Sequence, residues 1–74
     1  MDADSIACTA PALQQMFLRG LSKEMVEEAI HNPDQAGIGY KGRLLAYKAF
    51  GNKRIKVVYT ETAERFIVIS VMWD

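Results

Sequence analysis

The sequence predicts one α+β domain over residues 1–74, with two N-terminal helices packed on one face of an antiparallel β-sheet. Two observations lead to this prediction. Apolar residues recur at helical spacing in the first half of the chain and at alternate positions after about Gly37. Glycine- and proline-containing breaks separate the periodic segments. A chain of 74 residues has room for one small core and no second domain.

The first half contains start and stop signals for two helices. Thr9 is a suitable N-cap, and Pro11 follows in the first turn, where its missing N–H costs nothing. Gly20 stands where a left-handed residue ends a helix. Ser22 can cap a second helix, which Pro33 stops because the residue before a proline avoids the α region.

The second half contains strand signals. Strands are predicted around residues 44–47, over 55–60 and over 66–73, and the last of these is apolar on both faces. The Gly-Asn pair at 51–52 predicts a two-residue hairpin between the first two. Residues 5–8 are a further candidate for a short strand. Spacing predicts these core side chains: Met16, Phe17, Val26, Ile30, Ile55, Val57, Ile67, Ile69 and Val71.

Charge is sorted along the chain although the net charge is zero. Residues 36–60 hold no acid and six cations: Lys41, Arg43, Lys48, Lys53, Arg54 and Lys56. We call these six residues the basic ribbon. One interpretation is a surface for RNA or for an acidic protein segment. The other is that lysines line an exposed strand and prevent aggregation.

A phosphate-binding cradle is the most specific form of the first interpretation. Arg54 and Lys56 lie two residues apart on a predicted strand and so share a face. We expect Lys48, on the paired strand, to join them, with Arg43 and Tyr59 at the edges.

Composition favours a cytoplasmic protein without a membrane span. The single cysteine, Cys8, excludes an intrachain disulfide, and no run of about 18 apolar residues occurs. The acidic start, Met1 to Asp4, lacks the positive region of a secretory signal. The only histidine, His31, is expected to interact with the dipole at a helix C-terminus. With no second histidine or cysteine at ligand spacing, we expect no metal and no cofactor.

Two stretches resemble the small RelE-like proteins, most closely the BrnT toxins and a neighbouring uncharacterised family. They are LRGLSKEMVEEAIHNPD and GRLLAYKAFGNKRIKVVYTETAERFIVISV. The shared features are a turn of the form R/H-G-[IV]-S between two helices, an N/D-P-D/E after the second, and the two strands that follow. The matching residues are Arg19, Gly20, Leu21, Ser22, Asn32, Pro33, Asp34, Arg54, Val57, Val58, Tyr59, Thr60, Glu61, Glu64, Arg65, Ile69 and Ser70.

The resemblance implies a toxin of a type II toxin–antitoxin pair, acting on RNA or at the ribosome and silenced by a cognate antitoxin. It also implies that Arg19, in the family turn, contacts phosphate or a partner; a salt bridge or a helix-end cap is the alternative.

The chain departs from its relatives at positions linked to RNA cleavage. Pro11-Ala12 replaces a His-Ala pair, Gln15 replaces an arginine, and the chain ends Met72-Trp73-Asp74 in place of basic or tyrosine residues. We therefore expect an RNA-binding protein with weak or lost ribonuclease activity, and assign no catalytic residue. The alternative is a non-catalytic interaction domain whose basic ribbon binds an acidic partner or a second copy of itself. If a protein antitoxin binds, Trp73 or Phe50 is expected to be an apolar anchor.

Overall fold

A computed structural model describes residues 5–74. The elements, in chain order, are β1 (Ser5–Cys8), α1 (Ala10–Arg19), α2 (Lys23–His31), β2 (Gln35–Ile38), the 3-10 turn η1 (Tyr40–Gly42), β3 (Leu44–Phe50), β4 (Lys53–Glu61) and β5 (Arg65–Trp73). The α+β class and the two helices before the main sheet are confirmed. The acidic start, Met1 to Asp4, on which the expectation of no secretory signal rested, lies outside the described residues.

Both helices begin and end where the sequence predicted. The Thr9 hydroxyl accepts a hydrogen bond from the Ala12 N–H at 3.3 Å, and the Ser22 hydroxyl accepts one from Met25 at 3.2 Å. Gly20 takes φ 68°, and this left-handed residue closes α1. Local capping chemistry therefore suffices to define the helix boundaries.

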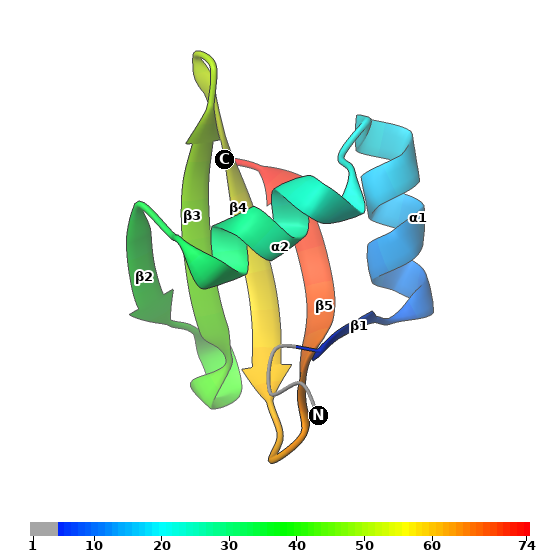
Figure 1. Cartoon of the computed structure of the whole chain (residues 1–74), viewed down its shortest axis with the longest axis vertical. Coiled ribbons are helices and arrows are strands. Elements are labelled where there is room, and N and C mark those ends of the chain that lie inside the picture. Colours follow the sequence, from blue (N-terminus) through cyan, green and yellow to red (C-terminus); the bar gives the residue numbers. More distant parts are fainter. Residues whose placement is uncertain (1–4) are drawn as a thin grey trace.

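The five strands form one sheet in the order β1-β5-β4-β3-β2, shown in Figure 1. Strands β2 to β5 form an antiparallel meander, as predicted. The sheet as a whole is mixed rather than wholly antiparallel, because β1 pairs with β5 in parallel, from Ser5 opposite Arg65 to Cys8 opposite Val68. A parallel neighbour is possible because α1 and α2 with the later strands provide the long connection that such pairing needs.

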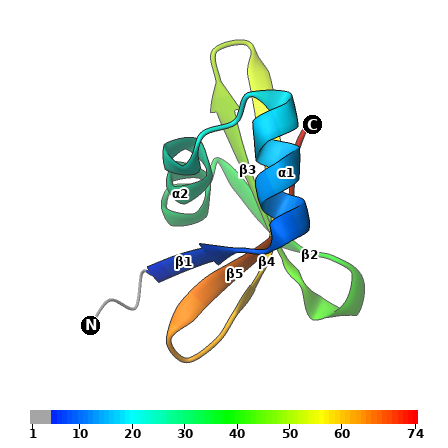
Figure 2. The same cartoon turned by 90° about the vertical axis from the view of Figure 1, so that its right-hand side faces the viewer.

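Helix α2 crosses one face of the sheet and α1 runs beside β5 at its edge, whereas neither of these helices of residues 5–74 covers the other face (Figures 1 and 2). We call these the helix face and the open face. The buried hydrophobic side chains lie between the helices and the helix face: Ala12, Met16, Leu21, Val26, Ala29, Ile30, Ala46, Ile55, Val57, Val68 and Val71. Six of the nine predicted core residues are among them.

A β-bulge accounts for two errors in the predicted core. Val58 pairs with Ser70 but Tyr59 pairs with Val68, so Ile69 is an extra residue on β5. Strict alternation predicted Ile67 and Ile69 as core. The extra residue changes which side chains face inward, so that Val68 is fully buried while Ile67 and Ile69 are only partly buried.

The prediction that Phe17 is a core residue is wrong. Its side chain is 85% exposed, and Leu13, one turn earlier, is 53% exposed. Helix α1 lies along β5 and buries only the narrow stripe of Ala12 and Met16. Helical spacing placed Phe17 next to Met16 on an apolar face, but the sheet extends far enough to cover only one side of that face.

Helix α1 also protects the edge of β5 beyond the end of β1. The Gln15 side-chain oxygen accepts hydrogen bonds from the Ser70 hydroxyl at 3.0 Å and from the Val71 N–H at 2.9 Å. The Thr9 N–H donates to the Val68 carbonyl at 3.0 Å. These contacts satisfy edge groups that would otherwise face solvent. Neither α1 nor α2, the helices of residues 5–74, is long and apolar enough to cross a membrane.

Candidate functional site

The open face carries a group of one aromatic and two basic side chains. Tyr47 on β3 pairs with Lys56 on β4, and the next residue on the same face, Arg54, lies opposite Ala49. The Arg54 guanidinium carbon lies 4.8 Å from the centre of the Tyr47 ring, and the Lys56 Nζ lies 6.0 Å from it. Both lie within the range of cation–π attraction. Tyr47 thus has basic groups from two positions of β4 around its ring.

Arg54 is held by two further contacts. Its guanidinium forms an ion pair with the Asp74 carboxylate, and its Nη1 donates to the Gln35 side-chain oxygen at 3.3 Å. Asp74 follows β5, and its own N–H donates to the Arg54 carbonyl at 2.7 Å. Arg54 is therefore held by Gln35 from β2 and by Asp74 from the end of β5, and the Asp74 carboxylate balances its charge.

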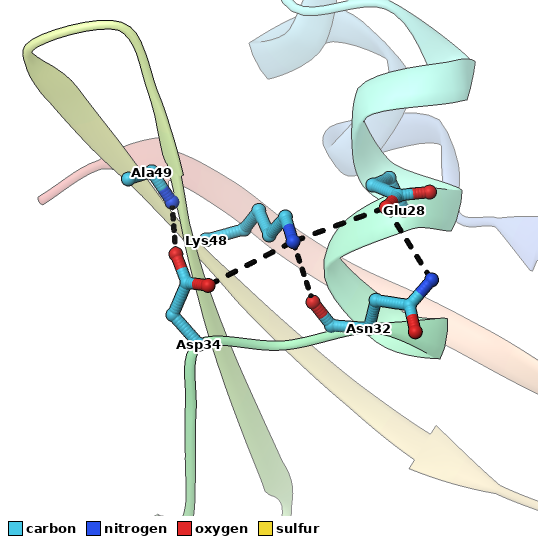
Figure 3. Close-up of polar contacts among 5 residues, drawn as sticks. All are labelled: Glu28, Asn32, Asp34, Lys48 and Ala49. Atoms are coloured by element: carbon cyan, nitrogen blue, oxygen red, sulfur yellow. Dashed lines mark hydrogen bonds and ion pairs between the residues drawn. The ribbon is translucent and has the colours of Figure 1, made fainter.

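Lys48 does not join this group, and that prediction is wrong. Lys48 pairs with Ile55, a fully buried residue of the helix face, so the lysine points toward α2. Its Nζ lies 2.9 Å from the Asn32 carbonyl oxygen, 3.8 Å from a Glu28 carboxylate oxygen and 3.7 Å from an Asp34 carboxylate oxygen. Figure 3 shows these contacts. Its side chain is 21% exposed. Lys48 joins β3 to the end of α2 and is a structural residue.

The remaining ribbon cations are dispersed. Lys53 begins β4 beside the hairpin loop, and its Nζ lies 5.4 Å from the Trp73 ring centre. Lys41, at φ 60°, belongs to the η1 turn with its Nζ 5.5 Å from the Tyr40 ring, and Arg43 follows that turn. The η1 turn precedes the first residue of β3, Leu44. Arg54 lies opposite Ala49, which is five residues and about 17 Å further along β3. The six cations therefore do not form one continuous surface.

Arg19 lies apart from the open-face group, at the exposed last position of α1. Its carbonyl oxygen accepts a hydrogen bond from the Trp73 indole N–H at 3.2 Å. Trp73 is partly buried and packs against the core, so it does not stand out as an exposed anchor. Phe50, the other expected anchor, also packs against the core.

Tyr59 is not at the edge of a phosphate cradle, because it packs against the core beneath the helices. Its ring meets Phe66 edge-on at 5.5 Å, and Phe66 lies 6.2 Å from the His31 ring. Burial raises the pKa of the Tyr59 phenol, and the nearby charge of Glu61 raises it further. His31 thus lies at the end of α2, as predicted, in an aromatic contact on the helix face.

The sequence contained enough information to place Tyr47 beside Lys56. Alternation along each strand by itself did not reveal this pair, but the register of the hairpin does. The hairpin loop Gly51-Asn52 sets Phe50 opposite Lys53. Two residues away from the loop on each strand, Lys48 lies opposite Ile55. Three residues away, Tyr47 lies opposite Lys56. Gln35 and Asp74 had no such local signal, because their contacts join Arg54 on β4 to β2 and to the end of β5, which are distant in the sequence.

The described residues enclose no cavity or cleft, and among them no cluster of three or more His, Cys, Asp or Glu could hold a metal ion. Cys8 is partly buried, with its sulfur 4.0 Å from that of Met16. Burial raises the pKa of the Cys8 thiol, an effect that the nearby charge of Lys23 opposes. A surface without a pocket, such as the open face, suits an extended ligand better than an enclosed small molecule.

Comparison with known proteins gives one match. The family described as a domain of unknown function, DUF4258, matches residues 9–73, which include both helices and strands β2 to β5. No curated protein and no solved structure matches the chain. The matched stretch covers all but the first strand and the last residue of the described fold, and the chain belongs to the DUF4258 family.

Proposed function

We propose that this protein is a RelE- and BrnT-like toxin-type protein that binds single-stranded RNA through the open face, with weak or lost ribonuclease activity. The observation that carries the proposal is Tyr47 on an uncovered sheet surface with Arg54 and Lys56 around its ring. Sheet surfaces that bind single-stranded RNA stack bases on aromatic rings and neutralise phosphates with nearby cations. Tyr47 supplies the ring, and Lys56 and Arg54 supply the charge.

Weak or lost cleavage is supported by the side chains near Tyr47. Cleavage by the adjacent 2′-hydroxyl needs a positioned base and a positioned acid. The histidine, His31, contacts Phe66 on the helix face. The carboxylate at the open-face group, Asp74, is held in an ion pair by Arg54. The group therefore has the means to hold RNA but no free acid–base pair among the residues that surround Tyr47.

The Asp74–Arg54 ion pair gives the proposal a test with effects in two directions. A phosphate that binds Arg54 must compete with the Asp74 carboxylate. Asp74→Asn removes the competing charge and keeps the shape, so it should tighten RNA binding. Lys56→Ala removes a phosphate contact and should weaken binding. Tyr47→Ala should weaken it by about 1–3 kcal/mol, the usual contribution of one stacked base.

The measurement is fluorescence anisotropy with a labelled single-stranded RNA at several salt concentrations. Lys56→Ala should reduce the slope of log K against log salt by about 0.7, one phosphate contact on a single strand. Lys23→Ala, an exposed lysine at the start of α2, removes the same charge elsewhere and is the matched control. Equal losses in Lys23→Ala and Lys56→Ala, or unchanged affinity in Tyr47→Ala, would contradict binding by the open face.

A second candidate function, protein interaction, is favoured by the exposed apolar flank of α1. Phe17 and Leu13 lie one turn apart and are 85% and 53% exposed. Aromatic side chains of this kind often anchor protein interfaces. An antitoxin encoded in an adjacent reading frame is the expected partner. Co-expression should yield a complex that Phe17→Ser disrupts and Lys56→Ala leaves intact; the reverse pattern would assign the partner to the open face.

A further inference from the structure

We propose that two copies of this chain associate through the free edges of their β2 strands, in antiparallel register about Gly37, to give one continuous sheet. The proposal rests on β2 alone and does not depend on RNA binding by the open face. It concerns the backbone edge of β2, which contains no charged residue. Of the basic ribbon, Lys41 lies nearby, in the turn that follows the strand.

The two edges of the sheet differ in protection. The β5 edge is covered by β1 along its first half and by Thr9 and Gln15 beyond it. Within residues 5–74, the outer edge of β2 has no neighbour in the sheet order (Figure 1). All four residues of β2 are exposed. It has no lysine, no proline and no bulge, the usual features that prevent edge-to-edge pairing.

The backbone of β2 presents hydrogen-bonding groups outward at two positions. The Gly39 N–H donates to the Arg43 carbonyl at 2.7 Å, inside the sheet. Polar groups of alternate residues in an antiparallel ladder point to opposite edges. Gly37 therefore faces β3 like Gly39, and Ala36 and Ile38 turn their N–H and C=O groups outward.

Two copies of β2 related by a two-fold axis beside Gly37 place these outward N–H groups opposite outward C=O groups of the other copy. Ala36 then pairs with Ile38 of the other copy, in both directions, and each pair exchanges two hydrogen bonds. The two Gly37 residues meet at the axis as a close, non-hydrogen-bonded pair, where neither has a side chain to obstruct the other. The 75% exposed side chain of Ile38 gains a neighbour across the new ladder.

The charged residues at the ends of β2 are compatible with a second copy in this orientation. Asp34 precedes the strand, and Lys41 follows it after Ile38. Antiparallel pairing avoids bringing like charges together, but the Asp34 carboxylate already contacts Lys48 at 3.7 Å and accepts from the Ala49 N–H at 2.8 Å within its own chain. The backbone hydrogen bonds, rather than charge, therefore set this orientation. The exposed Tyr40, 81% accessible, lies at the same end and can pack on the neighbouring copy.

The first experiment is sedimentation velocity up to about 1 mM protein, because an interface of one short strand pair is weak. The wild-type chain should show a concentration-dependent dimer. Ala36→Pro removes only an outward N–H, a change that edge strands tolerate, and should weaken dimerisation by about tenfold through two lost hydrogen bonds. Ile38→Lys, at a 75% exposed position, should weaken it similarly. A monomer at every concentration, or a dimer unchanged by both substitutions, would overturn the proposal.

The second experiment tests the register, with Cys8→Ala in every variant to remove the native thiol. Gly37→Cys places two sulfurs at the two-fold axis, and its Cβ would lie at an ordinary 3.9 Å from Leu45 within its own chain. It should form a disulfide-linked dimer under mild oxidation. Ala36→Cys is the matched control, since its counterpart would lie two residues out of register and beyond the reach of about 7 Å between Cα atoms. Equal cross-linking by both, or cross-linking by Ala36→Cys alone, would exclude this register.

Discussion

The two faces of the sheet use similar residues for opposite purposes. Lys48 and Lys56 lie on paired strands of the same hairpin, yet one points to α2 and the other to Tyr47. On the helix face, Lys48 has two carboxylates and a carbonyl within 4 Å. On the open face, Lys56 has an aromatic ring and no ion-pair partner within the described part of the chain.

This difference shows that the basic ribbon combines two physical roles. Lys48 stabilises the fold by joining β3 to the end of α2, where its charge is balanced. Lys56 has no ion-pair partner among the described residues, and the proposed RNA binding relies on its charge. A count of cations along the sequence treats the two residues as equal, although their side chains face opposite sides of the sheet. Substitutions of two valines and of two lysines compare the faces directly, and substitutions of Gln15 and Tyr59 test contacts that stabilise the fold elsewhere.

The largest expected effect compares two adjacent valines of β4. Val57 is fully buried on the helix face, whereas Val58 is on the open face and only partly buried. Val57→Ala should lower the free energy of unfolding by about 2–3 kcal/mol, from lost burial and a residual cavity. Val58→Ala should cost about 1 kcal/mol or less. Urea denaturation checks both, and equal losses would mean that the open face is also a packed surface.

The next effect tests how α1 protects the edge of β5. Gln15→Ala leaves the Val71 N–H and the Ser70 hydroxyl without their partner and should cost about 1–2 kcal/mol. Gln14→Ala, an exposed neighbour on the same helix, is the control and should change stability by less than about 0.5 kcal/mol. Thermal unfolding followed by circular dichroism measures both. If Gln15→Ala leaves the free energy of unfolding unchanged, water replaces the glutamine as hydrogen-bond partner at no cost in stability.

The comparison of the two lysines predicts a smaller effect. Lys48→Ala should destabilise the fold by about 1 kcal/mol, because a partly buried lysine loses two ion pairs and a hydrogen bond. Lys56→Ala should change stability by less than about 0.5 kcal/mol while lowering affinity for RNA. Parallel unfolding and anisotropy measurements are required on both variants. If Lys48→Ala lowers RNA affinity as much as Lys56→Ala does, the two faces are not functionally separate.

The smallest predicted effect concerns alkaline pH. The pKa of Tyr59 is raised above its usual 10.0 by burial and by Glu61. As the pH rises, the unfolded chain therefore loses this proton before the folded chain does. The stabilisation contributed by the protonated Tyr59 phenol is fully present below pH 10.0 and is lost as the pH rises through the folded-state pKa. Tyr59→Phe should remove this part of the alkaline loss. Unfolding curves at pH 9 to 11.5 provide the measurement, and an unchanged alkaline slope would assign the loss to other groups.

Most of the fold could be predicted from local sequence signals. Thr9, Ser22 and Gly20 define the helix boundaries by hydrogen bonds and backbone angles within a few residues. Gly51 supports the tight hairpin with φ 70°, as its lack of a Cβ allows. The candidate site was only partly predictable: Arg54 and Lys56 were placed together correctly, but Tyr47 was missed. Hairpin register would have identified it, since the loop length alone sets that pairing.

By itself, the sequence determined the α+β class, the helix ends and the period of each strand, because these depend on interactions between near neighbours. Only the tertiary structure decided which residues face solvent. Ile69 introduces a bulge that buries Val68, and the narrow contact between α1 and β5 leaves Phe17 exposed. The parallel pairing of β1 and the contact between Arg54 and Asp74 likewise join segments distant in sequence. Such features follow from how whole elements pack, and no local pattern specifies them.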